Sequence, residues 1–356
     1  MKVCFFTPAL GTGGAERVLS VLSKPLAKYY DEVHYIMWYD HPVFYHIDEK
    51  VKIVNVEKFS KATGKFRKMM WLRNYVKKEK PDLFISFSAP FNMLALTSLW
   101  KSEIKVIAAE RVDPRSFRWG KHYEILRNLL YRTSYGILAQ TDTSKDYFRG
   151  SLYKKTDVIY NPVLMEKDVV GSSIAHDKKN LIITAARLEK QKRHDLLIEV
   201  FSSFKKSFPD YKLVIYGKGS QLEYLKEVAR DNNVEDAVDF PGIVNNLWEK
   251  MAEARMFVMT SLFEGMSNSL IEAMCIGLPC ISTKVSGAVD LIESGKNGVL
   301  IDINDKSALL GAMTEIAENR ELAQSMAVNA SRLYDQLNVD TIAAQWINYI
   351  DRKIAE

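Results

Sequence analysis

Cysteines, long apolar runs and metal-binding motifs are all scarce in this chain of 356 residues. Its three cysteines, Cys4, Cys275 and Cys280, have no metal-site spacing, and this sparse use favours a reduced, cytosolic compartment. The first residues run directly into an apolar strand, Lys2 to Thr7, without a basic segment and a long apolar core. We therefore expect no secretory signal.

One segment has the length of a membrane span but not its composition. Residues 83–100 are 18 residues without a charge, close to the minimum for a transmembrane helix. The same segment contains Pro90, Asn92 and several hydroxyl side chains. We predict a strand, a turn and a buried helix here instead of a span.

Length and patterning indicate an α/β protein with two domains. A chain of 356 residues exceeds what a single core usually fills, so two domains of roughly 150 to 190 residues are expected. Short apolar runs alternate with longer amphipathic ones, which is typical of parallel sheets covered by helices. A break at Asn161-Pro162, followed by a polar stretch at 166–180, predicts the linker. Strands are predicted near 2–7, 33–38, 51–55, 83–87, 104–109, 135–139, 157–160, 181–185, 212–216, 238–240, 256–260, 279–282 and 298–301.

The segment from Glu264 to Glu272 places two carboxylates eight residues apart around the start of an expected helix. Small polar residues at 267–269 precede a helical pattern that begins at Leu270. The first amides of a helix lack partners and carry partial positive charge, so a phosphate could bind them. Glu272 could accept hydrogen bonds from a ribose diol, and Glu264 could reach a sugar hydroxyl. Read alone, the stretch fits a strand end and an ordinary surface helix equally well.

Two cations lie in a predicted strand-to-helix loop. Arg187 and Lys192 follow an apolar strand, and ligands of open parallel sheets bind beyond the carboxyl ends of the strands. A diphosphate would be neutralised at such a place. Gly217 follows the next strand and lets the backbone approach a ligand, and Ile243 follows another and could line a nucleobase.

A glycine-rich loop follows the first strand. Gly11, Gly13 and Gly14 suggest a dinucleotide site, but the Gly-x-Gly-x-x-Gly pattern would require glycine where Glu16 stands. Two readings remain, a backbone that approaches donor phosphates or sugar and a tight strand-to-helix turn.

Together these motifs resemble glycosyltransferase family 4, the retaining nucleotide-sugar transferases of the GT-B fold. The resemblance is carried by Arg187 with Lys192, by 264–274 and Gly277-x-Pro279, and by the Gly-Gly-Ala-Glu-Arg run that begins at Gly13. It implies two Rossmann-like parallel-sheet domains that face each other across a cleft. Residues 1–163 would bind the acceptor, 164–338 would bind the nucleotide sugar, and the helix at 339–356 would pack back on the first domain.

The resemblance also implies roles for individual residues. Arg187 and Lys192 would hold the donor diphosphate and Glu264 the transferred sugar, and these three are the catalytic candidates. The donor-binding candidates are Gly13, Gly14, Gly217, Ile243, Gly265, Met266, Ser267, Asn268, Ser269, Leu270 and Glu272. Many relatives carry a histidine in a loop of the first domain that here reads Ala109 to Asp113, which leaves Glu110 and Arg111 as candidates for sugar or acceptor contacts.

No metal or other cofactor is expected. The chain has no Asp-x-Asp motif, and cations and helix amides can stabilise a departing diphosphate without a metal. None of the six histidines belongs to a metal-binding motif of the sequence: His34, His41, His46, His122, His176 and His194. His194 neighbours the diphosphate loop, where we expect it to cap or pack the following helix.

Positive charge is concentrated in the first half of the chain. Residues 1–165 carry 27 Lys and Arg against 16 Asp and Glu, and residues 166–356 carry 22 against 28. Two groups of cations interleave with aromatic and Met side chains, which is typical of helices on an anionic membrane surface but also of solvated helix faces. The first group comprises Lys58, Lys61, Lys65, Arg67, Lys68, Arg73, Lys77, Lys78 and Lys80, and the second Arg111, Arg115, Arg118, Lys121, Arg127 and Arg132. No nucleic-acid motif accompanies them, so nucleic acid is not an expected partner.

The expected reaction is transfer of a sugar, with retained configuration, from a UDP-hexose or UDP-N-acetylhexosamine. The resemblance to bacterial enzymes of surface polysaccharides implies a glycan acceptor linked to polyprenyl diphosphate and a peripheral place on the inner face of the cell membrane. Two alternatives remain, a soluble transferase that modifies a protein or small metabolite and a non-catalytic nucleotide-sugar-binding subunit.

Overall fold

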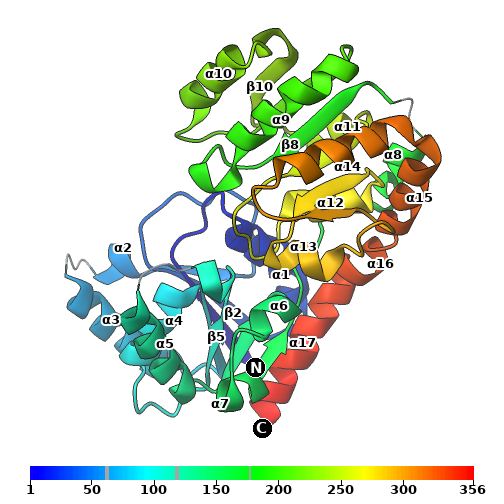
Figure 1. Ribbon diagram of the computed structural model, residues 1–356. Coiled ribbons are helices and arrows are strands. Elements are labelled where there is room, and N and C mark those ends of the chain that lie inside the picture. The colour runs from blue at the N-terminus through cyan, green and yellow to red at the C-terminus, as the bar shows by residue number, and fades with distance from the viewer. Residues whose placement is uncertain (61–63, 117–119, 176–177) are drawn as a thin grey trace. The chain divides into compact units, whose positions relative to one another are not determined.

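The computed structural model describes residues 1–60, 64–116, 120–175 and 178–356. The chain divides into two compact units (Figure 1). Unit 1 comprises Met1–Leu164 and Leu337–Glu356, and unit 2 comprises Met165–Gln336. The final helix therefore belongs to the unit that contains the start of the chain.

Unit 1 is built on a parallel sheet of seven strands in the order β3-β2-β1-β4-β5-β6-β7. The central strands are buried on both faces, which explains why they read as continuous apolar runs and not as alternating ones. The strands are β1 (Lys2–Thr7), β2 (Glu32–Met37), β3 (Lys52–Asn55), β4 (Leu83–Phe87), β5 (Val106–Ala109), β6 (Gly136–Ala139) and β7 (Thr156–Val158).

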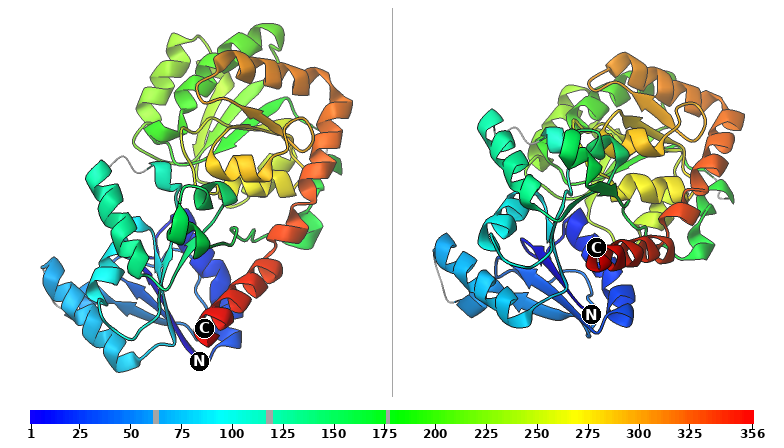
Figure 2. Two further views of the ribbon diagram at one scale, coloured as in Figure 1. Left: turned by 60° about the horizontal axis from the view of Figure 1, so that its bottom comes forward. Right: turned by 90° about the horizontal axis from the view of Figure 1, so that it is seen from below.

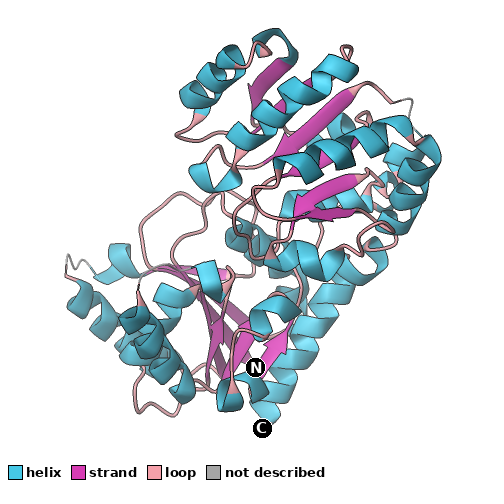
Figure 3. Ribbon diagram, viewed as in Figure 1, coloured by secondary structure: helices cyan, strands magenta, loops and turns pink. Residues whose placement is uncertain are grey.

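Helices cover the unit 1 sheet, and Figure 3 shows helices around each group of strands. The helices α3, α4 and α5 pack in sequence against one another. The unit's helices are α1 (Gly14–Tyr29), α2 (Val56–Ser60), α3 (Lys65–Glu79), α4 (Ala89–Ser98), η1 (Pro114–Ser116), α5 (Lys121–Thr133), α6 (Asp142–Lys145), α7 (Gly150–Lys154) and α17 (Val339–Ala355).

The terminal helix α17 lies beside α1 in both views of Figure 2. Tyr30 donates a hydrogen bond to Asp351 across this contact at 2.9 Å. Trp346 is fully buried and stacks on Phe87 with a centroid distance of 6.0 Å. Burial of a large aromatic side chain stabilises a fold by about 3 kcal/mol, so α17 is an integral part of unit 1.

Unit 2 contains a parallel sheet of six strands in the order β10-β9-β8-β11-β12-β13. Its core is aliphatic and aromatic, and it includes the fully buried Phe201 and Phe204 of α9. The strands are β8 (Leu181–Ala185), β9 (Lys212–Tyr216), β10 (Val238–Gly242), β11 (Met256–Met259), β12 (Cys280–Thr283) and β13 (Val299–Ile301).

The helices of unit 2 pack in one connected set. Helix α9 packs on α10 and α14, α14 also packs on α15, α15 packs on α8 and α12, and both of these pack on α11. Their bounds are η2 (Lys167–Val169), α8 (Ser172–Ala175), η3 (Lys190–Lys192), α9 (His194–Ser207), α10 (Leu222–Asp231), η4 (Glu235–Ala237), α11 (Leu247–Ala252), α12 (Asn268–Cys275), α13 (Ser286–Leu291), α14 (Lys306–Glu318), α15 (Arg320–Ser331) and α16 (Tyr334–Leu337).

The strand predictions are confirmed, each to within about two residues at its boundaries. The uncharged segment 83–100 forms β4 and α4, as expected. Across the described residues, every helix falls short of the length and apolarity that a membrane span requires.

Candidate active site

The loops predicted to bind a donor meet at one edge of the unit 2 sheet. Arg187 follows β8, Gly217 follows β9 and Glu264 follows β11, and these three strands are neighbours in the order β9-β8-β11. Ile243 follows β10, which pairs with β9. The carboxyl ends of parallel strands share one edge, so the four loops converge where open α/β sheets bind ligands.

Lys192 and Glu264 form an ion pair at this edge. Both side chains are largely enclosed, with 11% and 13% of their surface exposed. The Ser261 hydroxyl donates a second hydrogen bond, at 2.8 Å, to the Glu264 oxygen that Lys192 contacts. The structure thus joins two of the three catalytic candidates, and an incoming diphosphate would compete with Glu264 for the ammonium group.

Two hydroxyl residues that the sequence analysis missed hold this arrangement. The Thr260 hydroxyl lies 2.9 Å from the carbonyl oxygen of Lys192 and 3.0 Å from that of Arg193. The amide of Leu262 donates to the carbonyl of Gln191 at 2.8 Å. The signal was the pair Thr260-Ser261 directly after β11, where buried hydroxyls at a strand end need partners.

Arg187 remains exposed, and the described part of the chain provides no ion-pair partner for it. Its neighbour His194 begins α9 and is buried. Burial lowers the pKa of His194 to about 4, so the imidazole is neutral at pH 7. The expectation that His194 packs into its helix is met, while Arg187 keeps its guanidinium available to an anion.

The glycines after β9 let two backbones come close together. Gly217 has φ 133°, and a Cβ atom there would lie 1.8 Å from the carbonyl oxygen of Ala186. A Cβ atom on Gly219 would lie 2.3 Å from the carbonyl oxygen of Leu188. No side chain fits at either position, so these glycines bring the β9 loop onto the loop that carries Arg187.

The helix after Glu264 begins at Asn268, two residues earlier than predicted. Ser267 is its N-cap and makes no capping hydrogen bond with its side chain. The Ser267 and Ser269 hydroxyls lie 3.1 Å apart. This first turn has the backbone geometry and macrodipole of an anion site, and Leu270 is buried beneath it.

Glycines also shape the segment before this helix. The amide of Gly287 donates to the carbonyl of Gly265 at 2.7 Å. A Cβ atom on Gly287 would lie 2.8 Å from the Cα atom of Met266. The start of α13 therefore packs directly against the backbone of residues 265–266, a contact that was not predicted from the sequence.

Glu272 lies in the second turn of α12, not in the first as predicted. Only 3% of its surface is exposed, so the reading of Glu272 as an ordinary surface acid is wrong. A buried carboxylate requires polar partners, which fits a role in holding a ligand or the surrounding loops. Ile243, the proposed nucleobase contact, is 59% exposed.

A cavity of about 550 Å³ adjoins these loops but contains none of the predicted donor residues. It lies between η3 and the start of α10, and its lining includes Glu189, Lys190, Arg193 and Gln221. Arg193 is paired with Asp195 at 3.1 Å there. Its mixed charges do not indicate one ligand.

In unit 1, Gly13 is the N-cap of α1 and Gly14 is its first residue. Glu16, in the first turn of this helix, acts electrostatically on Arg111. Arg111 is buried, and its guanidinium donates to Asn161 at 2.6 Å. Burial lowers the pKa of Arg111 to about 10. The glycine loop and Arg111 thus lie at the same edge of the unit 1 sheet.

Glu110 is buried in a network that fixes its carboxyl group. The Tyr131 hydroxyl donates to Glu110 at 2.5 Å, and the Asn92 amide donates to the Tyr131 oxygen at 2.8 Å. Burial raises the pKa of Glu110 to about 6, against the opposing effects of Arg127 and Tyr131. Its other oxygen, Oε2, is buried without a hydrogen-bond partner among the described residues, so an acceptor could reach this carboxyl group only after the surrounding side chains move.

The two basic groups of unit 1 are only partly at the surface. Lys68 is buried and pairs with Glu57 at 2.5 Å, and Arg127 is buried against Tyr147. Arg73 donates to the carbonyl of Ser98 at 2.8 Å. The membrane-surface interpretation therefore does not extend to Lys68, Arg73, Arg111 and Arg127, whose cationic groups are bonded within the protein. Lys61, Phe117, Arg118, Trp119 and His176 lie outside the described residues.

Exposed apolar side chains accompany the remaining cations. Phe66 is 74% exposed on α3, and Phe59 and Met70 are exposed nearby. Helix α5 also exposes Ile125, Leu126 and Leu129, which the sequence analysis missed because burial depends on tertiary packing.

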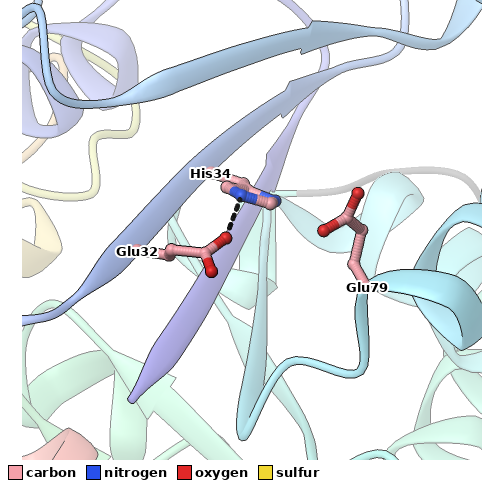
Figure 4. Close-up of side chains that lie close together, drawn as sticks. All are labelled: Glu32, His34 and Glu79. Atoms are coloured by element: carbon pink, nitrogen blue, oxygen red, sulfur yellow. Dashed lines mark ion pairs between the residues drawn. The ribbon is translucent and has the colours of Figure 1, made fainter.

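Among the described residues, one group has the composition of a metal site: Glu32, His34 and Glu79 (Figure 4). The Lys2 ammonium contacts both carboxylates, at 3.0 Å and 2.9 Å, and so supplies the positive charge that a metal ion would bring. The Tyr75 hydroxyl lies 3.0 Å from His34 Nδ1, and burial lowers the pKa of the imidazole. These contacts explain the group as a structural network at the amino end of the sheet.

Sequence comparisons divide the chain in the same way as the structure. The family described as "Glycosyltransferase Family 4" matches residues 12–167, and "Glycosyl transferases group 1" matches residues 168–333. A Campylobacter jejuni protein is 25% identical over 98% of both chains and is named "GalNAc-alpha-(1->4)-GalNAc-alpha-(1->3)-diNAcBac-PP-undecaprenol alpha-1,4-N-acetyl-D-galactosaminyltransferase".

Two further matches span nearly the whole chain. A second Campylobacter jejuni protein is 26% identical over 97% of this chain and 99% of its own, and is named "N-acetylgalactosamine-N,N'-diacetylbacillosaminyl-diphospho-undecaprenol 4-alpha-N-acetylgalactosaminyltransferase". The structure of HepE from Anabaena in complex with UDP has a TM-score of 0.80 and 18% identity, and it covers 99% of this chain and 100% of its own. This likeness shows a common GT-B fold.

Proposed function

The chain belongs to glycosyltransferase family 4, and we propose that it transfers a sugar from a UDP-sugar, with retained configuration, to a glycan linked to polyprenyl diphosphate. Unit 2 binds the donor and unit 1 the acceptor. The proposal rests foremost on the Lys192–Glu264 pair beside the first turn of α12.

The roles of the residues follow from charge and position. Lys192 and Arg187 bind the diphosphate, and the first amides of α12 add partial positive charge to it. This stabilises the departing UDP without a metal ion. Glu264, released from Lys192 as the phosphates bind, accepts a hydrogen bond from a hydroxyl of the transferred sugar, and Glu272 binds the ribose.

The acceptor class is supported by the two Campylobacter jejuni relatives, whose names specify undecaprenyl-diphosphate-linked glycans. The donor nucleotide is supported by the UDP complex of the HepE structure. The donor sugar is a hexose or an N-acetylhexosamine.

Glu272→Gln tests the donor site. UDP, GDP and ADP sugars are offered with a polyprenyl-diphosphate-linked acceptor, with and without EDTA, and nucleotide release is measured. We expect release from a UDP-sugar that EDTA does not change, and a rise in KM of about tenfold or more in Glu272→Gln. Glu227→Ala, which removes an exposed acid of α10, serves as the control.

Each other result has a clear meaning. Loss of nucleotide release in the presence of EDTA contradicts metal independence. An isolated product in which the anomeric configuration of the transferred sugar is inverted contradicts retention. Donor binding without turnover on any lipid-linked or soluble acceptor favours the non-catalytic alternative.

We also propose that unit 1 lies on an anionic membrane surface, peripherally on the cytoplasmic face. The exposed Phe59, Phe66 and Met70 lie among exposed cations of α2 and α3 that include Lys65 and Arg67. Shallow insertion of apolar side chains combined with attraction of cations to headgroups is the usual basis of such binding.

Phe66→Ser with Met70→Ser tests this surface in sedimentation with vesicles of phosphatidylglycerol and phosphatidylcholine. We expect binding to weaken about tenfold, because two exposed apolar contacts are lost. Ile303→Ser, at an exposed site in unit 2, should leave binding unchanged. Equal sedimentation of all three proteins would contradict the proposal.

A further inference from the structure

A second set of cations surrounds a small cavity in unit 2. The cavity has a volume of about 200 Å³, several times the roughly 30 Å³ that one water occupies. Lys178, Arg255 and Arg320 line it, together with Ser173 and Gln324. Helices α8 and α15 both contribute lining residues. These two helices pack against each other, and Figure 1 shows them side by side.

The cavity lies at the opposite edge of the sheet from the donor loops. Lys178 precedes β8, Arg255 precedes β11, and Pro279 precedes β12. These positions mark the amino ends of parallel strands, whereas Arg187 and Glu264 follow the carboxyl ends. A ligand in this cavity would therefore be distinct from the donor.

No carboxylate among the described residues lines the cavity. The Lys178 ammonium donates to neutral oxygens, the hydroxyl of Ser173 and the carbonyl of Ala252. The Nε atom of Arg255 is buried and has no hydrogen-bond partner within the described residues. The neighbouring Lys179, in contrast, is paired with Glu253 at 2.6 Å.

The three positive charges act on the same small region. Burial, and to a smaller extent the charge of Arg255, lowers the pKa of Lys178 to about 8. The charges of Arg255 and Arg320 both oppose the rise in the pKa of Tyr211 that burial causes, so the two guanidinium groups lie near the same side chain. Lys178 and Arg255 are partly removed from water, so their mutual repulsion raises the free energy of the folded protein, and a bound anion relieves this cost.

We propose that this cavity is a binding site for a phosphate-type dianion, held by Lys178, Arg255 and Arg320. Arginine offers a planar fork of donors that matches phosphate oxygens, and the unpaired Nε of Arg255 provides one such donor. The Ser173 hydroxyl and the Gln324 amide add neutral donors.

Calorimetric titration with inorganic phosphate at pH 7 tests the site. We expect Arg255→Gln and Arg320→Gln each to weaken phosphate binding about tenfold, because each removes a charge-assisted contact. Lys179→Gln removes the same charge from an adjacent, exposed position and should bind phosphate like the wild type. Lys192→Ala should also bind normally, since it alters only the donor site.

Two results would overturn the proposal. If Lys192→Ala abolishes phosphate binding, the phosphate occupies the donor loops. If the two arginine variants bind as tightly as the wild type, the cavity is not the site. Arg320 is exposed, so its substitution should leave the fold intact, and unchanged thermal unfolding without phosphate checks this.

A measurement on the unmodified protein is independent of any variant. A dianion beside Lys178 raises its pKa, so phosphate binding at pH 8 should take up as much as roughly half a proton. Titrations in buffers of different ionisation enthalpy measure this uptake. Its absence would exclude Lys178 from the site.

Discussion

The two units share a parallel-sheet architecture but use the charges at their carboxyl edges differently. In unit 2, Lys192 is opposed by Glu264 and Arg187 is exposed. In unit 1, Glu110 and Arg111 are buried and bonded to Tyr131 and Asn161. We expect Lys192 to exchange its carboxylate partner for a diphosphate. Glu110 and Arg111 are instead enclosed by the fold, and Oε2 of Glu110 and Nε of Arg111 are buried without a hydrogen-bond partner among the described residues.

This difference has a physical basis. Replacing one anion by another around an ammonium group leaves the charge balanced, so a ligand can displace Glu264 at little cost. Removing a partner from a buried charge leaves an unpaired group and costs about 3 to 5 kcal/mol. We therefore expect substitutions at the unit 2 edge to change catalysis, and those at the unit 1 edge to change stability.

Lys192→Ala should have the largest effect and would sharpen the comparison. Loss of one charged group that stabilises a departing diphosphate lowers kcat by about 10²- to 10³-fold. Steady-state nucleotide release measures this loss at a temperature where thermal unfolding shows the variant to be folded, because Lys192→Ala also removes the cationic partner of the largely enclosed Glu264. Lys190→Ala, in the same short helix, removes an exposed cation as a control. Near-normal turnover in Lys192→Ala would remove the catalytic distinction between the units.

Gly217→Ala should have the next largest effect, on the loop after β9. A Cβ atom there would meet the Ala186 carbonyl oxygen at 1.8 Å, in a conformation with φ 133°. We expect a loss of unfolding free energy of about 3 kcal/mol, from strain and the displaced backbone.

The matched control for Gly217→Ala is Gly150→Ala in unit 1. Gly150 also has a positive φ, 58°, but nothing described lies within 4 Å of its Cβ position. Only the left-handed conformation is penalised there, by about 1 kcal/mol. Chemical denaturation compares the two variants, and equal losses would show that close packing adds nothing at Gly217.

The strands, and the positions of the loops at their carboxyl ends, were predictable from the sequence because buried parallel strands form continuous apolar runs and the loops follow them directly. The start of α12 was misplaced by two residues, since Asn268 and Ser269 are weak helix formers that also suit caps. The pairing of Lys192 with Glu264, which are 72 residues apart, carries no local signal.

Burial was the property that the sequence predicted least well. Arg127 and Lys68 belong to basic runs yet are buried against distant partners, and Ile125 and Leu126 are exposed although apolar. Periodicity identifies a helix but not how much of it neighbouring elements cover. Glu272 was likewise predicted to lie on the helix that follows Glu264, but its burial was not predicted.

Glu110→Gln should have the smallest effect and tests the unit 1 side of the comparison through pH. Burial raises the pKa of Glu110 to about 6 in the folded protein, above its ordinary value of 4.5. The folded state therefore binds the proton more tightly than the unfolded state. The stabilising effect is fully present below about pH 4.5 and is lost as the pH rises through about 6, amounting to about 2 kcal/mol.

The amide introduced by Glu110→Gln would keep an oxygen that accepts the Tyr131 hydrogen bond but cannot ionise. We therefore expect the variant to gain about 2 kcal/mol relative to the wild type between pH 4 and about pH 7.5. Urea unfolding of both proteins across this range isolates the difference from other titrating groups. If the difference in unfolding free energy between the two proteins does not change with pH, Glu110 ionises as freely as an exposed carboxylate. If kcat falls while the unfolding free energy is unchanged, Glu110 takes part in the reaction and does not stabilise the fold.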